Sequence, residues 1–405
     1  MKFIKTVPLE RSILLLRWAR IFKGLMFILP VVVILYQHKG LSLGDFFLIQ
    51  SIFSIAVFIL EIPTGYIGDL FSRKKVITFA FFIYSFGYFV LFIFDGFLSV
   101  LSAEILWGLA GALYSGTGSA YVYDVLKKQD REKDFLKVQG KNKSAEIFGS
   151  TIAVFTGGII YRIFGPDTTL FISFLVTVIA FIMILFLPEL EGIQRVVEEG
   201  KSKMQDIIDI AKYAYSHKEI KWLMLFPAAF GSGTMMIFWA LQPIMENNLI
   251  PVALFGFFTG MNQLFRALFS MFGSKIFRKL KTRNFSLLLF TFLALGLIIA
   301  MTLPSLQNPY INYFLLLIMS FVAASQAGLS LVTTSMINHR IKSDERATVL
   351  SVNSMFGRIL MAIIMLSIKF LIDGAGLQAM LITLSPIIIV MTFIAMKKLL
   401  KLKIH

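Results

Sequence analysis

The sequence predicts an all-α membrane protein with twelve transmembrane helices in two six-helix bundles. Of its 405 residues 57% are hydrophobic and the mean hydropathy is +0.80, which is more apolar than a water-soluble protein can bury. Twelve apolar stretches reach the ~20 residues that a helix needs to cross a bilayer. A single sustained polar stretch, 189–218, separates the first six from the last six.

The twelve spans are defined by apolar runs and oriented by the charges between them. Lys and Arg concentrate in alternate connections, including 73–75, 127–143 and 275–283, while the intervening turns carry almost none. By the positive-inside rule both termini and the central linker are cytoplasmic. We expect a multi-pass protein of a bacterial-type cytoplasmic membrane, with spans at 12–36, 43–66, 75–95, 97–124, 144–163, 167–188, 219–246, 251–274, 284–303, 309–338, 347–372 and 375–397.

The linker divides the chain into three parts. Residues 191–218 combine acidic side chains with apolar ones at helical spacing, which predicts an amphipathic surface helix. We therefore expect an N-terminal bundle at 1–190, the linker at 191–218 and a C-terminal bundle at 219–405. Two halves of six spans each are typical of transporters built from internal repeats.

The formal net charge of +16 does not indicate a nucleic-acid partner, because the cations lie in short loops between apolar runs. The chain has no Cys, so it can form neither a disulfide nor a thiolate metal site. Lys2 and Lys5 precede an apolar run that lacks a small-residue cleavage site, so a removable signal peptide is not expected. We expect a monomer without a cofactor.

Charges are distributed unevenly among the spans. Spans 75–95, 167–188, 284–303 and 375–397 have no charged residue in their cores, whereas charges occur in several of the others. An ionisable group that faces lipid costs several kcal/mol. The four uncharged spans are therefore expected at the periphery, and the charged ones around a shared interior.

The loop after the second span carries the most specific motif. It reads Gly65-Tyr-Ile-Gly-Asp69-Leu-Phe-Ser-Arg73-Lys74. It resembles the major facilitator superfamily of secondary transporters, in which this loop reads Gly-x-Leu-x-Asp-Arg-x-Gly-Arg-Lys; Leu70 replaces the first Arg and Ser72 the second Gly. The resemblance implies the major facilitator fold and alternating access driven by an ion gradient.

The same resemblance assigns a conformational latch. In the family the loop Asp docks at the start of the eleventh helix, here near 344–348, where an anion is favoured at a helix N-terminus. Family members often place an acidic partner for the loop Arg at the position of Asp124. The predicted latch comprises Gly65, Asp69, Arg73, Lys74 and Asp124.

Charged residues near the middle of the first two spans are candidates for the transport site. Arg17, Arg20 and Lys23 cover about a third of the circumference of span 12–36. Lys23 lies about half way across, so it either faces a water-filled cavity or forms a structural ion pair. Glu61 can pair with such a cation or take up a proton, because desolvation raises the pKa of a carboxyl group.

Spans four and five carry a further acid and two groups of small residues. Proton-driven exporters of the superfamily usually have an Arg where this chain has Glu104, which is thus a candidate proton carrier. Gly108 and Gly111 nearby are expected to permit close helix contact. Gly149 and Gly157 resemble an antiporter signature, although helix packing explains them equally well.

The C-terminal half supplies a polar, aromatic and Met-rich set of side chains. Arg266 and Arg358 fall near the middle of their spans, where an unpaired guanidinium is costly. They either face a cavity or pair with other groups. Because the predicted membrane core holds more cations than carboxylates, an anionic or zwitterionic substrate is favoured. The remaining cavity candidates are Trp239, Gln242, Asn262 and Gln326.

Three functions are considered for a membrane protein of this composition, and the sequence favours the first. The first is a proton-coupled exporter of amphiphilic small molecules, such as drugs or natural products. The second is an importer of an anionic nutrient, or a lipid flippase, with the same fold. The third, a membrane enzyme or sensor, is disfavoured because no nucleophile, base and orienting group occur as a set.

The four His residues are isolated, so a metal site is not expected.

Overall fold

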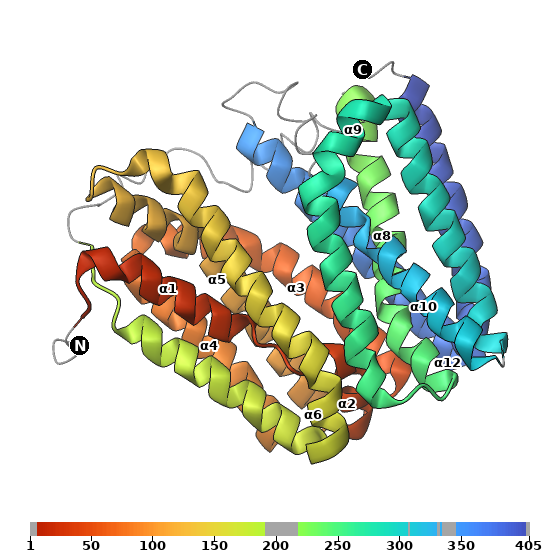
Figure 1. Ribbon diagram of the computed structural model, residues 1–405, viewed down its shortest axis with the longest axis horizontal. Coiled ribbons are helices and arrows are strands. Elements are labelled where there is room, and N and C mark those ends of the chain that lie inside the picture. The colour runs from red at the N-terminus through yellow and green to blue at the C-terminus, as the bar shows by residue number, and fades with distance from the viewer. Residues whose placement is uncertain (1–5, 191–217, 307, 330–332, 334–345, 402–405) are drawn as a thin grey trace. The chain divides into compact units, whose positions relative to one another are not determined.

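The computed structural model describes residues 6–190, 218–306, 308–329, 333 and 346–401; within these ranges the side chains at 62, 65, 66, 68, 69, 218–220, 274, 281 and 346–355 are not described (Figure 1). Every regular element in the described ranges is helical. This confirms the predicted all-α membrane architecture.

The chain divides into two compact units, one formed by Met1–Leu41 and Ile55–Gly200 and the other by Ser42–Ser54 and Lys201–His405. The predicted linker at 191–218 lies almost wholly outside the described residues. α3 (Leu43–Leu70) contributes its first part to the second unit and its remainder to the first.

The first unit packs its helices along one another around an apolar interior (Figure 1). α1 packs mainly on α6, and α4 packs on both α5 and α6. The helices of this unit other than α3 are α1 (Leu9–Gly24), η1 (Leu29–Val31), α2 (Val32–His38), α4 (Arg73–Ile93), α5 (Phe97–Lys127), η2 (Glu132–Asp134) and α6 (Phe135–Leu185).

The second unit follows the same principle. α8 packs on α12 and α10, and α9 packs on α10 and α12. Its helices besides the start of α3 are α8 (Lys218–Asn247), α9 (Val252–Thr302), η3 (Leu303–Ser305), α10 (Pro309–Ala324) and α12 (Arg346–Lys401).

Ten helical stretches of the described chain are long and apolar enough to span a membrane. Two of them, Glu132–Leu185 and Phe356–Lys401, have 54 and 46 residues, more than twice the ~20 that one crossing needs. Each contains a glycine with a positive φ of 83°, Gly165 in α6 and Gly376 in α12, where the helix is interrupted. Each stretch therefore has room for two crossings, so ten stretches are compatible with the predicted twelve spans.

The first predicted span is not one continuous helix. α1 ends at Gly24, and regular structure resumes only at Leu29 in η1. Pro30 has no N–H with which to bond the carbonyl of Met26, and its ring disfavours continuation of the preceding helix. Leu9–His38 as a whole is long and apolar enough to span a membrane, as predicted for 12–36, but the helix is interrupted directly after Lys23 and Gly24.

The apolar outer surface of the first unit lies on the helices predicted to be peripheral. Large hydrophobic side chains of α4 and of the second part of α6 are exposed, and they include Phe79, Phe82, Phe86, Phe89, Ile93, Phe171, Leu175, Ile179 and Ile182. In a bilayer such a surface contacts acyl chains rather than water. Both helices thus present the apolar surface that peripheral spans require.

Candidate functional site

The candidate site of the first unit lies beside the interruption of the first span. A helix end at membrane depth leaves backbone groups without intrahelical partners, and such broken helices occur at the binding sites of transporters. Lys23 belongs to the last turn of α1, where the partial negative charge of the helix end favours a cation. The break therefore positions a cation inside the membrane.

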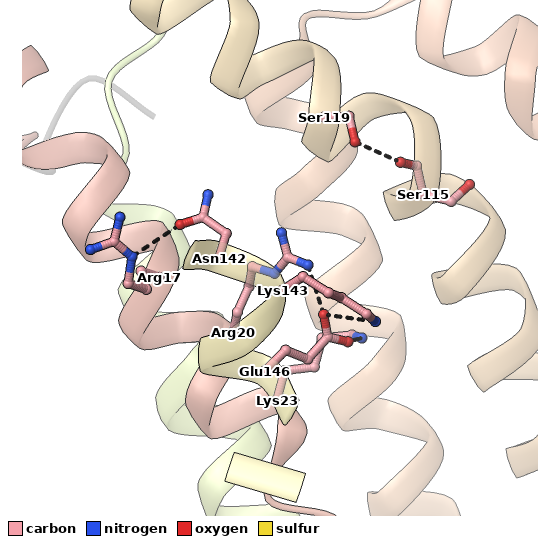
Figure 2. Close-up of polar contacts among 8 residues, drawn as sticks. All are labelled: Arg17, Arg20, Lys23, Ser115, Ser119, Asn142, Lys143 and Glu146. Carbon is pink, nitrogen blue, oxygen red and sulfur yellow. Dashed lines mark hydrogen bonds and ion pairs between the residues drawn. The ribbon is translucent and has the colours of Figure 1, made fainter. Parts of the chain in front are cut away.

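Three cations converge on one carboxylate at this position (Figure 2). The Arg20 Nη2 atom lies 2.8 Å from Glu146 Oε2. Lys23 Nζ lies 3.4 Å from the other carboxylate oxygen, and Lys143 Nζ lies 3.6 Å from Oε2. Arg20 is buried, whereas the Lys143 side chain is 64% exposed. The set has three positive charges and one negative, a net charge of +2.

Glycines allow α1 and α6 to approach closely enough for these contacts. A Cβ atom added to Gly149 would lie 2.3 Å from the carbonyl oxygen of Ile21, and one added to Gly157 would lie 2.2 Å from that of Phe27. Both distances are shorter than any allowed contact, so these positions require glycine. The close approach places Glu146, on α6, within reach of the cations of α1.

Aromatic rings form a second side of the cluster. Lys23 Nζ lies 5.2 Å from the ring centre of Tyr84 and 5.6 Å from that of Tyr114, and the Arg20 guanidinium lies 5.8 Å from the Tyr114 ring. Cations within ~6 Å of an aromatic face are stabilised by the ring quadrupole. The rings thus offset part of the cost of keeping two cations beside one carboxylate at membrane depth.

A polar face of α5 is open beside this cluster. Ser115 and Ser119 are exposed, and the Ser119 hydroxyl donates to the carbonyl of Ser115 (Figure 2). A Cβ atom at Gly111 or Gly116 would meet nothing within 4 Å. Within the described residues these glycines do not mediate close helix contact, so that expectation is wrong for Gly111. The face is open rather than packed.

Neighbouring polar residues extend the cluster along α1. Arg17 Nε donates to Asn142 Oδ1 over 3.1 Å, and Asn142 is fully buried (Figure 2). Arg17, Arg20 and Lys23 therefore all contact α6 side chains. Lys23 forms an ion pair with Glu146 and also faces the rings of Tyr84 and Tyr114.

The other predicted acids of the first unit occupy different surroundings. Glu104 is buried on α5 and accepts a hydrogen bond of 2.7 Å from the hydroxyl of Tyr36. Glu61, on α3, is half-buried, and its backbone carbonyl accepts a hydrogen bond from Thr64. Both carboxylates thus lie on helices other than α1 and α6, which supply the ion pairs of the Glu146 cluster.

Part of the predicted latch is formed. Arg73 Nε lies 2.5 Å from Asp124 Oδ2, so the start of α4 is joined to the end of α5. Lys74 does not share this ion pair and lines a separate hollow on α4. The side chains of Gly65 and Asp69, and the docking position near 344–348, lie outside the described residues. The Arg73–Asp124 pair is the described core of the latch.

Several predicted cavity residues of the second unit hold its helices together. Asn262 is buried on α9 and donates to the carbonyl of Ser320 on α10 over 2.9 Å. Thr234 of α8 donates to Gln326 Oε1, directly after α10, over 3.2 Å. Hydrogen bonds of this kind join helices in membranes. These amides therefore serve helix packing.

The aromatic and cationic candidates of the second unit differ in exposure. Trp239 is buried against Phe46, with ring centres 5.3 Å apart, and Gln242 is also buried. Arg266 is exposed on α9, and Arg358 is half-buried on α12. The second unit therefore presents an exposed guanidinium at Arg266 and keeps Trp239 and Gln242 inside.

Glu146 and Asn142 are functional candidates that sequence reasoning overlooked. They are four residues apart in the segment that enters span 144–163. Glu146 lies three residues before Gly149. A carboxylate within an apolar span, one helical turn from a small residue, was the signal that could have identified it.

The sequence matches the profile of the Major Facilitator Superfamily over residues 21–331, which is more than half of the chain. The chain belongs to the major facilitator superfamily. Membership in this superfamily confirms the resemblance seen in the loop at residues 65–74, and with the apolar helices it indicates a multi-pass membrane protein.

Relatives in the superfamily share the fold over most of the chain. The chain is similar to the nucleoside transporter NupG, in a variant form, with 14% identity, a TM-score of 0.77 and coverage of 96% of this chain and 100% of that one. It is also similar to the human organic anion transporter TETRAN, with 16% identity, a TM-score of 0.60 and coverage of 96% and 100%. At such identities the likeness demonstrates the fold alone.

A curated relative is closer in sequence but matches over a shorter range. An uncharacterized transporter of Buchnera aphidicola subsp. Acyrthosiphon pisum is 28% identical over 177 residues, which is 40% of each chain. The chain thus spans about two fifths of the length of the curated relatives it matches.

Proposed function

We propose that this chain is a secondary transporter that couples protons to the movement of a small organic anion or zwitterion by alternating access. The observation that carries the proposal is the set of three cations around Glu146 beside the interruption of the first span. An excess of cations in a low-dielectric site favours an anionic partner, because unpaired buried charges are strongly destabilising.

The coupling follows from competition for the same cations. While Glu146 is ionised it occupies Arg20 and Lys23. A substrate carboxylate or phosphate that binds Arg20 and Lys23 withdraws both cations from Glu146, and the carboxylate, now without them, takes up a proton. Proton and anion therefore bind together, and their joint movement down a proton gradient gives symport.

This coupling bears on the direction of transport. Symport with protons that enter the cell brings the anion inward, which corresponds to the predicted alternative of an anionic-nutrient importer. Export of an amphiphile requires a substrate that competes with the proton for Glu146, namely a cation. Three cations within 4 Å of that carboxylate disfavour such a substrate. The import reading is the one that the geometry supports best.

One feature of the structure also supports export. Gly149 and Gly157 resemble an antiporter signature; on α6, Gly149 lies against Ile21 of α1 and Gly157 against Phe27, in the segment that follows α1. A closely packed, pliable contact at that place suits an antiporter as well as a symporter. Proton-coupled efflux of amphiphiles, multidrug or natural-product, is therefore the second candidate. Two proteins of similar structure are a nucleoside transporter and an organic anion transporter, which supports a polar solute.

The proposed transporter works as a single chain in a lipid bilayer. The partners are a small-molecule substrate and the lipid bilayer, with no cofactor in the transport step and a monomer as the working unit. The predicted location is the cytoplasmic membrane with both termini inside, because cations concentrate in alternate connections.

Transport into proteoliposomes tests the proposal. The purified full chain is reconstituted, and uptake is measured for labelled carboxylates, zwitterionic amino acids and the cation tetraphenylphosphonium, with and without an acid exterior. We expect accumulation of an anion or zwitterion that requires the acid exterior. Efflux of tetraphenylphosphonium in exchange for protons, without anion uptake, contradicts symport and favours export.

A further inference from the structure

We propose that the first unit binds a phospholipid with a primary ammonium headgroup, such as phosphatidylethanolamine, in a hollow between α4 and the end of α6. The hollow has a volume of about 320 Å³ and lies apart from the Glu146 cluster. Its lining consists of Lys74, Lys75, Thr78, Phe79, Phe82, Phe181, Leu185 and Glu189.

The polar end of the hollow carries charged side chains of both signs that do not form a direct ion pair. Lys74 and Lys75 lie in the first turn of α4, and Glu189 follows the end of α6. Within the described part of the chain no ion pair within 4 Å joins Glu189 to either lysine. The charges therefore line the same space while leaving room for a ligand between them.

The position of Glu189 is fixed by the backbone beside it. The hydroxyl of Tyr121 donates to the carbonyl of Pro188 over 3.0 Å, and the backbone N–H of Val7 donates to the carbonyl of Phe186 over 2.9 Å. These bonds hold the segment after α6 against α5 and the N-terminal segment. The backbone next to Glu189 is therefore held in place, and its exposed side chain lines the same hollow as the lysines.

The other end of the hollow is apolar and faces outward. Phe79 and Phe82 are 53% and 46% exposed on α4. Phe82 contacts the ring of Phe181 on α6, with centres 5.7 Å apart. In a bilayer these side chains contact acyl chains. The hollow thus changes from charged to apolar along its length, as a phospholipid does.

Charge complementarity selects the headgroup. The two lysines suit a phosphate diester, and a carboxylate beside them suits an ammonium that donates hydrogen bonds. Phosphatidylethanolamine offers both groups. Phosphatidylcholine has a cation that cannot donate a hydrogen bond, and phosphatidylglycerol has no cation to offer Glu189. The hollow is bordered by the start of the third predicted span and the end of the sixth. Both of these positions are predicted to lie on the cytoplasmic side, where such headgroups are found.

Native mass spectrometry of the full chain in detergent tests this assignment. Dioleoyl phosphatidylethanolamine, its N-methylated forms up to phosphatidylcholine, and phosphatidylglycerol are titrated separately. We expect phosphatidylethanolamine to bind at least about fivefold more tightly than phosphatidylcholine, with affinity falling as methyl groups replace donors. Glycerophosphoethanolamine, which has no acyl chains, is expected not to compete.

Variants identify the site. Glu189→Gln is expected to abolish the preference for phosphatidylethanolamine over phosphatidylcholine, and Lys75→Gln to weaken both lipids. Lys137→Gln removes an exposed cation elsewhere in the same unit and should change neither. Equal binding of phosphatidylethanolamine and phosphatidylcholine by the unmodified chain overturns the proposal. So does tighter binding of phosphatidylglycerol, or an unchanged preference in Glu189→Gln. If a variant fails to fold, the methylation series on the unmodified chain decides.

Discussion

Tyr36 donates a hydrogen bond of 2.7 Å to the carboxylate of Glu104 and so joins α2 to α5 inside the first unit. Both residues are buried, Tyr36 completely. Tyr36 lies beyond the interruption of the first span, on the short helix that resumes it. The bond therefore anchors the second part of that span, while Arg20, Lys23 and Glu146 join its first part to α6.

We predict that Tyr36→Phe lowers the free energy of unfolding by about 1–3 kcal/mol, because the buried carboxylate of Glu104 loses a donor. Glu104→Gln keeps an oxygen that accepts this bond and is expected to retain proton-driven transport. Thermal unfolding in detergent and initial uptake rates check the two variants. Loss of proton coupling in Glu104→Gln, with folding intact, would return Glu104 to the role of proton carrier.

Two glycines of α6 are expected to respond differently to substitution by alanine, because only one of the two lies at the close contact with α1. Gly149→Ala forces a methyl group against the Ile21 carbonyl and should destabilise by about 1–3 kcal/mol. Gly140→Ala, where a Cβ meets nothing within 4 Å, should be neutral or stabilise by up to about 1 kcal/mol. Melting temperatures of the pair provide the comparison. Equal effects would argue against a close backbone approach.

The Arg73–Asp124 pair predicts a non-additive effect on transport. Arg73→Gln and Asp124→Asn should each slow transport, and the double variant should be no slower than the worse single one, because both remove the same contact. Asp69→Asn, which tests the part of the latch outside the described residues, should leave the protein folded but slow transport. Additive losses in the double variant would assign Arg73 and Asp124 to separate tasks.

The turn between α4 and α5 contains a pH-sensitive contact outside the membrane spans. Lys39 Nζ lies 2.7 Å from Asp95 Oδ1 and, by donating a hydrogen bond, holds the pKa of that carboxyl below its ordinary value of 3.8. A depressed carboxyl pKa contributes stability above the unfolded-state pKa, and this contribution is lost as the pH falls through the folded-state pKa. Asp95 is 76% exposed, so screening by solvent keeps the effect within about 1 kcal/mol.

The expected result is that Asp95→Asn melts below the unmodified chain near neutral pH, and that the difference shrinks below the unfolded-state pKa and is lost as the pH falls through the folded-state pKa. Thermal unfolding of both proteins across this range measures it. A difference that persists at acid pH would show that packing, rather than the charge of Asp95, stabilises the turn.

Sequence reasoning recovered the features that depend on apolar length and on one motif. The tight connection between Leu70 and Arg73 and the apolar surfaces of α4 and α6 follow from hydropathy and the loop pattern. The position of Asp124 opposite Arg73 came from the family resemblance, and the structure confirms their contact.

The missed features depend on packing between distant segments. The interruption after Gly24 arises from Pro30 within a strongly apolar run, and hydropathy does not register a change of backbone direction. Glu146 gains its role because Gly149 lets α6 approach α1, a contact between residues more than a hundred positions apart. The helix-joining hydrogen bonds of Asn262 and Gln326 likewise depend on neighbouring helices that the sequence pattern does not identify.

The most direct test of the central claim is transport by Glu146→Gln, with Lys143→Gln as the control that removes an exposed partner of the same carboxylate. The neutral amide permanently frees Arg20 and Lys23. We predict that Glu146→Gln binds the transported anion with an affinity that does not depend on pH. The variant should still exchange labelled anion in counterflow, but it should no longer accumulate the anion under an imposed proton gradient. Accumulation driven by that gradient at the unmodified rate would contradict the account.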